Sequence, residues 1–252
     1  MRVDSTGRTR RRSGPALRVL GIDIGGSFLK AAVLDARGRM LTEKLKVKTP
    51  APCPPKLMIR ALQKLVEPLP SYNHIAIGFP GVVRAGRVIT APHWGNKVWA
   101  NFELANTLSH RLGGVPARLI NDAEMQGLAV IRGKGLELVL TLGTGAGTAL
   151  FRDGDIMPHL ELAQHPIHKG DSYNDYVGDA ALKRIGKKRW SKRIGRTIGI
   201  LHSLLNYDHL FIGGGNASRI TIRLPDNASL VSNDAGIEGG AALWRRGFRA
   251  PL

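Results

Sequence analysis

The chain has 252 residues, 43% of them hydrophobic, which is enough to bury one large core or two modest ones. No apolar run approaches the ~20 residues of a membrane-spanning helix, and no long apolar stretch follows the basic N-terminus as in a secretory signal. The single cysteine, Cys53, excludes an intramolecular disulfide and a multi-cysteine zinc site. We therefore expect a cytoplasmic protein with no membrane partner, and the net charge of +18 favours a polyanionic partner.

The first half of the chain alternates strand and helix patterns after a basic tail. Residues 1–16 are Arg-rich and polar, and we expect them to be disordered. Residues 17–47 predict three strands with glycine turns at Gly25-Gly26 and Gly38. Apolar residues at helical spacing over 57–66 predict a helix, which Pro68 and Pro70 end. A buried strand follows over 74–79, and then a hairpin around Ala85-Gly86.

The second half continues the alternation. We expect a helix capped by Asn101 and running to residue 112, a strand over 115–120, and a helix over 123–131. Later segments predict helices over 173–185 and 190–206, a strand over 210–212, and a closing helix from Gly236 to about residue 246. This order indicates two α/β lobes. The N-terminal lobe would span residues 17–120, completed by a C-terminal helix within 236–248, and the C-terminal lobe residues 121–235.

One pattern occurs twice. Residues 19–40 and 138–157 each contain an apolar run, a Gly-rich turn, a second apolar run and a polar hairpin signal. Two ordinary hairpins would explain the glycines, but not the agreement of the flanking patterns. We interpret the repeat as a duplicated fold whose halves face each other across a cleft. Glycine turns expose backbone N–H groups, so two of them at one cleft suit a phosphate chain and phosphoryl transfer.

The two turns carry complementary chemistry. In the first, the Asp23 carboxylate can orient Mg²⁺, while the amides of Gly25, Gly26 and Ser27 and the ammonium group of Lys30 meet phosphate oxygens. The second turn, residues 143–147, repeats the device with the hydroxyl of Thr144 as an added donor.

Asn121-Asp122 stands where a strand leads into a helix. In a phosphoryl-transfer cleft, a carboxylate there can accept the proton of an attacking hydroxyl. Asn and Asp are also common as plain helix caps, and from these two residues alone the cap is the favoured interpretation.

The combination of motifs resembles the ROK family of sugar kinases, and most of all its polyphosphate glucokinase and glucomannokinase branch. The motifs occur in the family's order over residues 17–250: Asp23-Ile-Gly-Gly26, Gly78-Phe-Pro-Gly81, Asn121-Asp122-Ala123, Leu140-Thr-Leu-Gly-Thr-Gly145, Leu160-Glu-Leu162 and Gly213-Gly-Gly215. The resemblance implies a two-lobed, actin-like (ribonuclease H-type) fold in which sugar and phosphoryl donor meet between the lobes.

The resemblance also implies roles for single residues. Asp122 would be the general base, and the sugar would contact Asn121, Glu161, Pro80 and Gly81. Gln164 stands where the family usually has a His, three residues after the sugar-binding Glu, and it would still hydrogen-bond a sugar hydroxyl although it cannot ligate zinc. Asp23, Gly25, Gly26 and Lys30 would form one phosphate loop, and Thr144 and Gly145 the other. A nucleotide would pack at Gly213, Gly214 and Gly215. The family's zinc-binding cysteine cluster is absent, so we expect no zinc, and dimers common in the family allow a homodimer.

Together these features predict a Mg²⁺-dependent hexose kinase that phosphorylates the 6-hydroxyl of glucose or a relative from polyphosphate, ATP or both. A catalytically weakened sugar sensor with the same fold is the alternative, because of Gln164. Nucleic-acid binding rests on charge alone, so we expect no specific nucleic-acid partner. The basic cluster over 183–196 places Lys188, Lys192 and Arg196 on one helix face, which is either a polyanion track or a solvated surface.

Overall fold

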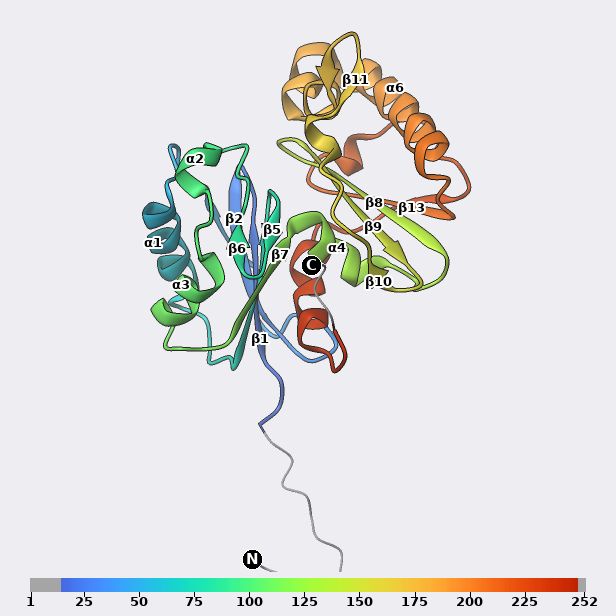
Figure 1. The fold of residues 1–252 in the computed structure, drawn as a ribbon. Coiled ribbons are helices and arrows are strands. Elements are labelled where there is room, and N and C mark those ends of the chain that lie inside the picture. The colour runs from blue at the N-terminus through green and yellow to red at the C-terminus, as the bar shows by residue number, and fades with distance from the viewer. Residues whose placement is uncertain (1–14, 249–252) are drawn as a thin grey trace, which may run out of the picture.

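The computed structural model describes residues 15–248, and they form two lobes, each built around a five-stranded sheet (Figure 1). Nearly all of the predicted basic tail lies outside the described residues. Within them, no helix combines the length and the apolar composition needed to cross a bilayer. The α/β class and the two-lobed arrangement expected from the sequence are confirmed.

The first sheet has the strand order β3-β2-β1-β4-β7. Its strands are β1 (Val19–Ile24), β2 (Phe28–Leu34), β3 (Leu45–Lys48), β4 (His74–Phe79) and β7 (Ala117–Asn121). β2 runs antiparallel to β1, whereas β4 is parallel to both β1 and β7. One face is covered by α1 (Pro55–Val66) and α3 (Leu104–Arg111), with α2 (Asn96–Trp99) above them (Figure 1). The short hairpin of β5 (Val83–Arg84) and β6 (Arg87–Val88) forms at the predicted turn.

The second sheet has the order β10-β9-β8-β13-β14. Its strands are β8 (Leu136–Leu142), β9 (Ala146–Arg152), β10 (Asp155–Ile156), β13 (His209–Gly213) and β14 (Ala228–Leu230). The rest of this lobe consists of η1 (Leu162–Gln164), β11 (Pro166–His168), β12 (Asp171–Ser172), α5 (Tyr173–Val177), α6 (Asp179–Leu205) and η2 (Ala217–Arg219). Buried apolar residues such as Trp190, Ile194 and Leu201 fix α6 against the sheet.

The two sheets repeat one topology. In each, the first strand pairs antiparallel with the strand that follows it, and its other edge pairs with a parallel strand. Three residues connect β1 to β2 (25–27) and three connect β8 to β9 (143–145). The two Gly-rich turns therefore occupy equivalent positions in their sheets, and they meet between the lobes.

Between the sheets lies α4 (Asp122–Val130), packed against α7 (Ala235–Glu238) and η3 (Gly239–Trp244) (Figure 1). At two positions the neighbouring segments approach α4 too closely to admit even a Cβ atom. A Cβ on Gly239 would lie 1.7 Å from the Met125 carbonyl oxygen, and one on Gly127 would lie 2.3 Å from the Phe151 ring. Glycine at these two positions lets the backbones of α4 and its neighbours on both sides touch.

Two helix predictions are wrong, one at the N-terminus of the helix and the other in its interior. Asn101 does not cap α3. Its N–H donates to the Val88 carbonyl, its φ is 59°, and α3 begins after Glu103. The helix predicted over 173–185 ends at Val177 and restarts at Asp179, whereas its predicted end agrees with the non-helical Gly186 (φ 76°, ψ 158°) inside α6. At the break, Gly178 is extended, and the Asp179 N–H donates to the Gly143 and Thr144 carbonyls at 3.1 and 3.3 Å. No side chain fits at Gly178, because a Cβ would lie 2.5 and 2.8 Å from the Asn174 and Thr144 carbonyl oxygens.

The predicted closing helix is also wrong in type. Only Ala235–Glu238 is α-helical, and the remainder, Gly239–Trp244, is a 3-10 helix. A Cβ on Gly240 would lie 2.9 Å from that of Ala76 on β4. Adjacent glycines that allow this close packing also weaken the α-helix, since glycine has low helix propensity. The segment nevertheless packs on the first sheet, where the sequence places it.

Candidate active site

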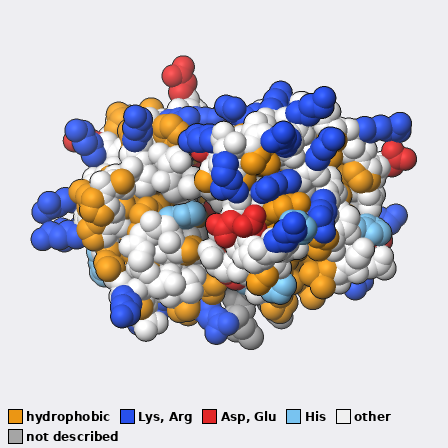
Figure 2. Space-filling model, turned by 90° about the horizontal axis from the view of Figure 1, so that it is seen from above, with side chains coloured by type: hydrophobic (Ala, Val, Ile, Leu, Met, Phe, Trp, Pro, Cys, Tyr) orange, Lys and Arg blue, Asp and Glu red, His pale blue; other side chains and the backbone are white. Residues whose placement is uncertain are grey.

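A cleft of about 540 Å³ lies between the lobes and is lined by residues of both sheets and of α4. It collects most of the residues singled out in the sequence: Asp23, Gly25, Gly26, Ser27, Lys30, Pro80, Gly81, Asn121, Asp122, Thr144, Gly145, Glu161, Gly214 and Gly215. Figure 2 shows acidic side chains inside a hollow with Lys and Arg side chains around much of its rim. The described cleft does not include Gln164, which is exposed on η1, or Gly213, which is buried at the end of β13.

The first glycine turn carries an internal ion pair. Asp23 and Lys30 are partners in the β1–β2 register, and Lys30 Nζ lies 2.8 Å from Asp23 Oδ2. The Gly25 N–H donates to the Phe28 carbonyl at 3.0 Å, and the Thr49 hydroxyl donates to the Gly25 carbonyl at 2.7 Å. These bonds fix the turn with its charged pair at the edge of the cleft.

The second glycine turn is held by neutral groups. The Gly143 N–H donates to the Gly145 carbonyl at 2.9 Å, and the Ala146 N–H donates to Asn174 Oδ1 at 2.8 Å. The Thr144 Oγ1 lies 2.9 Å from the Ser27 Oγ of the first turn. The structure therefore brings the two predicted phosphate turns into direct contact across the cleft.

The side-chain oxygen and nitrogen of Asn121 are both used in hydrogen bonds to the backbone. Its Oδ1 accepts the N–H groups of Ala123 and Glu124 at 2.8 and 3.3 Å, and its Nδ2 donates to the Phe79 and Gly81 carbonyls at 3.4 and 3.2 Å. The Glu124 carboxylate accepts the Asn121 N–H in return, which completes a capping box. Asn121 thus caps α4 and ties it to the loop after β4, and its role toward a sugar stays a prediction.

Asp122, the first residue of α4, lies at the cleft with a perturbed carboxyl group. Burial, together with the charges of Asp23 and Glu161, raises the pKa of Asp122 to about 7, against the opposing effects of the Ala123 N–H and His159. A carboxylate with a pKa near neutrality is suited to general-base chemistry, since it takes up and releases a proton at the working pH. The pair therefore provides both features that the sequence suggested: Asn121 caps the helix, and Asp122 places a carboxylate in the cleft.

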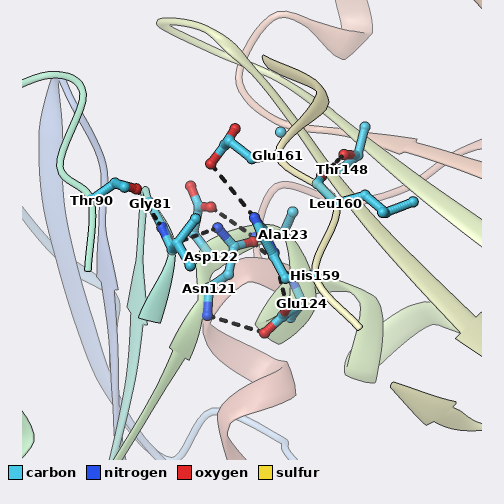
Figure 3. Close-up of polar contacts among 12 residues, drawn as sticks. Gly81, Thr90, Asn121, Asp122, Ala123, Glu124, Thr148, His159, Leu160 and Glu161 are labelled. Carbon is cyan, nitrogen blue, oxygen red and sulfur yellow. Dashed lines mark hydrogen bonds and ion pairs between the residues drawn. The ribbon is translucent and has the colours of Figure 1, made fainter. Parts of the chain in front are cut away.

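The structure adds His159, which no motif in the sequence marks, to the residues around Glu161. Its Nδ1 lies 3.0 Å from Glu124 Oε1, and its Nε2 lies 3.5 Å from Glu161 Oε2 (Figure 3). The two carboxylates raise the pKa of His159 to about 9, although burial alone would lower it. The only signal in the sequence is a His two residues before Glu161, which does not reveal Glu124 as its second partner.

The cleft also includes polar and charged residues that no sequence motif marked, among them Lys46, Gln126, Asn216 and Arg219. Lys183, the first residue of the basic cluster predicted over 183–196, lines the cleft as well. Basic side chains thus come from both lobes, Lys46 from β3 and Lys183 from α6, and the latter pairs with Asp179 at 2.6 Å. Gln126, one turn after Asp122 on α4, fills the space where Gly213 has no side chain.

The cleft suits a magnesium ion that arrives with phosphate better than a metal held by the protein alone. Within residues 15–248, no three His, Cys, Asp or Glu side chains are grouped to hold a metal ion. Mg²⁺ commonly binds through one or two carboxylates, phosphate oxygens and several waters. Asp23 fits this donor set, since only its Oδ2 is engaged by Lys30.

Comparison with known proteins now identifies the family. The model of the "ROK family" matches residues 19–158, more than half of the chain. This chain belongs to the ROK family. A polyphosphate glucokinase from Mycobacterium tuberculosis (strain ATCC 25618 / H37Rv) is 29% identical over 254 residues, which cover 94% of this chain and 93% of that protein.

Solved structures of ROK proteins agree with this fold. The inorganic polyphosphate/ATP-glucomannokinase from Arthrobacter sp. strain KM is 30% identical, with a TM-score of 0.79 over 90% of this chain and 97% of that one. The ROK family glucokinase from Streptomyces griseus, solved with glucose and AMPPNP, is 21% identical, with a TM-score of 0.74 over 91% and 100% of the two chains. The latter supports the fold alone, whereas the former also supports membership of the polyphosphate-using branch.

Proposed function

We propose that this protein is a hexose kinase that transfers a phosphoryl group from inorganic polyphosphate, ATP or both to the 6-hydroxyl of glucose or a related hexose. The observation that carries the proposal is the position of Asp122, a carboxylate with a pKa near 7, in one cleft with two glycine turns that touch through Ser27 and Thr144. The glucokinase and glucomannokinase names of the similar proteins support the same activity.

In the proposed reaction, the sugar lies against Pro80 and Gly81 on one lobe and Glu161 on the other. Asp122 accepts the proton of the 6-hydroxyl while that oxygen bonds to the terminal phosphorus of the donor. The bond from this phosphorus to the bridging oxygen breaks, and the shortened polyphosphate, or ADP, leaves. Holding the reacting groups together in a cleft supplies much of the rate enhancement in such reactions.

The two glycine turns would bind the phosphates. Backbone N–H groups of Gly26 and Gly145 and the hydroxyl of Thr144 would donate to phosphate oxygens, and Lys30 would add a positive charge. The Gly25 N–H, which the sequence also assigned to phosphate, is instead taken by the Phe28 carbonyl within the turn. Asp23 would hold Mg²⁺, which neutralises phosphate charge when bound. These assignments use groups at the cleft, whereas Gln164 would have to turn inward to reach a sugar there.

The basic surface favours polyphosphate as the donor. Lys30, Lys46, Lys183 and Arg219 line the cleft, and α6 continues beyond it with exposed Lys188, Lys192 and Arg196 at positions i, i+4 and i+8. A long anion can contact all of them, whereas a nucleotide ends near Gly214 and Gly215. Because exposed charges act through solvent, binding along α6 should weaken as salt screens them.

The activity is tested by a coupled glucose 6-phosphate assay with ATP and with long-chain polyphosphate. We expect turnover from the wild-type chain and a loss of roughly a thousandfold in kcat for Asp122→Ala, since general bases contribute about 10²–10⁴-fold. Calorimetry that detects glucose binding while every sugar and donor gives no turnover would refute the kinase and support a sugar sensor instead.

The donor is tested by comparing two triple variants. Lys188→Ser/Lys192→Ser/Arg196→Ser removes the basic face of α6, and Lys56→Ser/Arg60→Ser/Lys64→Ser removes exposed charges of the same spacing from α1 on the other lobe. We expect only the first to raise KM for polyphosphate, severalfold, and neither to change KM for ATP. Equal effects of the two variants would mean that net charge alone attracts the donor.

A further inference from the structure

His159 is held in a fixed place by both its backbone and its ring. It precedes η1, and the neighbouring Leu160 carbonyl accepts the Thr148 hydroxyl of β9 at 3.0 Å (Figure 3). This bond anchors the segment on the second sheet with Leu160 exposed, while the His159 and Glu161 side chains approach each other. The ring itself is only 15% exposed.

The ring connects a buried carboxylate to one in the cleft. Glu124, 3% exposed, lies on α4 and accepts the Asn121 N–H with Oε2 while its Oε1 faces His159 Nδ1. Glu161 lines the cleft and faces His159 Nε2. Among the described residues, Nε2 is buried and has no hydrogen-bond partner, so its contact with Glu161 at 3.5 Å is an ion pair rather than a hydrogen bond. Only a doubly protonated imidazole presents an N–H and a positive charge to both carboxylates at once.

We propose that His159 is a positioning residue that fixes Glu161 toward the sugar and joins it to the N-terminus of α4, which carries Asp122. This inference rests on the proposed kinase function, because it assigns Glu161 to the sugar. Without the imidazolium, Glu161 is free to rotate away from the cleft, and Glu124 becomes a buried carboxylate without a charge partner, which is unfavourable.

Charge also links His159 to the general base. The groups that act on the imidazolium are Glu124 of α4 and Glu161 of its own segment, and its charge in turn lowers the pKa of Asp122, also on α4. Loss of that charge therefore raises the pKa of Asp122. A general base with a raised pKa needs a higher pH to be ionised. In a plot of kcat/KM against pH, the fall in activity on the acid side therefore begins at a higher pH; we call this part of the profile the acid limb.

The first experiment measures glucose kinetics of His159→Gln and His159→Leu, with His165→Gln as a matched control. His165 is an exposed histidine in the same segment that does not line the cleft. We expect KM for glucose to rise about tenfold or more in His159→Leu and less in His159→Gln, because binding by Glu161 is weakened. The acid limb should move to higher pH in both, and the control should behave as wild type. An unchanged KM and pH profile in both His159 variants would overturn the proposal.

A double-mutant cycle tests the pairing itself. In the Glu161→Gln background, His159→Gln should have little further effect on glucose affinity measured by calorimetry, since the two residues act as one unit. Fully additive losses would overturn the proposal. The calorimetric cycle needs no turnover, so it remains decisive if the kinase assay fails.

A spectroscopic measurement works on the wild-type fold. NMR titration of the His159 ring should show it protonated through neutral pH, with its pKa lowered by Glu161→Gln. A ring that loses its proton below pH 7 in the wild-type protein would contradict the double contact with Glu124 and Glu161.

Discussion

The two glycine turns occupy equivalent positions in equivalent sheets, yet they carry different chemistry. In the first, the strand register pairs Asp23 with Lys30, a charged couple. In the second, the corresponding register pairs Thr141 with Gly147, and the Thr141 hydroxyl accepts the Gly147 N–H at 3.1 Å. A repeated backbone thus supports two kinds of phosphate contact, a charged one that suits a metal ion and a neutral one built from amides and hydroxyls.

The sharpest way to test this difference is to replace the corresponding polar side chain of each pair, Asp23 in the first and Thr141 in the second. Asp23→Asn should lower kcat by about 100-fold or more, because it removes the carboxylate proposed for Mg²⁺ and leaves Lys30 without its ion pair. Thr141→Val, its counterpart in the second sheet, should cost less than tenfold, since it removes one neutral hydrogen bond. Coupled assays at saturating glucose measure both. Equal losses would show that the two turns do not divide the chemistry in this way.

A smaller effect is expected at the contact between the turns. Thr144→Val removes a hydroxyl that meets Ser27 and is proposed to donate to phosphate. We expect KM for the donor to rise about tenfold, which corresponds to one hydrogen bond to a charged group. Thr144→Ser keeps the hydroxyl and should restore most of the affinity. Failure of the serine variant to do so would assign the effect to packing.

Replacing Asp122 should increase the stability of the folded protein while it lowers the activity. Because the pKa of Asp122 is raised to about 7 in the fold, its ionised form destabilises the native state above that pH. Asp122→Asn should therefore raise the free energy of unfolding by about 4 kcal/mol at pH 8, because each pH unit between the ordinary pKa of 3.8 and the raised pKa of about 7 corresponds to about 1.4 kcal/mol. The gain should shrink as pH falls from 7 and vanish near pH 3, below the pKa of the unfolded carboxyl, where the group is largely neutral in both states. Denaturant unfolding at several pH values measures it, and an equal gain at pH 3 would contradict the electrostatic cause.

The smallest effect concerns pH dependence. The charge of Asp23 helps to raise the pKa of Asp122. In Asp23→Asn, the acid limb of the residual kcat/KM should therefore move to lower pH, opposite to the shift expected for His159 variants. Thr141→Val removes no charge and should leave the limb in place. A limb that stays fixed in Asp23→Asn would mean that burial alone sets the pKa of Asp122.

Local sequence signals predicted where the two turns and Asp122 lie, because each stands at a strand–turn or strand–helix junction with a recognisable pattern, and the structure brings all three to one cleft. The errors came from contacts between distant segments. Asn101 has the composition of a helix cap, but its N–H is taken by Val88. Likewise, the break at Gly178 depends on the carbonyl of Thr144 in another element.

His159 shows the same limit within the site. Its role depends on Glu124, which stands 35 positions earlier on a different element. Glu124 follows Asn121 by three residues, so the sequence reads as an ordinary capping box, and the second use of its carboxylate is invisible. Similarly, Lys46 enters the cleft from β3, and nothing in its own neighbourhood marks it, whereas Lys183 belongs to the basic cluster that the sequence shows.

The close packing around α4 has a consequence for how this enzyme tolerates change. Gly127 abuts Phe151 of the second sheet, while Met125 abuts Gly239 beside the first, so the helix bearing Asp122 is clamped between both halves. Even an alanine at either glycine must displace the helix, since neither gap admits a methyl group. Such substitutions would lower activity as changes at the catalytic residues do, although neither glycine lines the cleft.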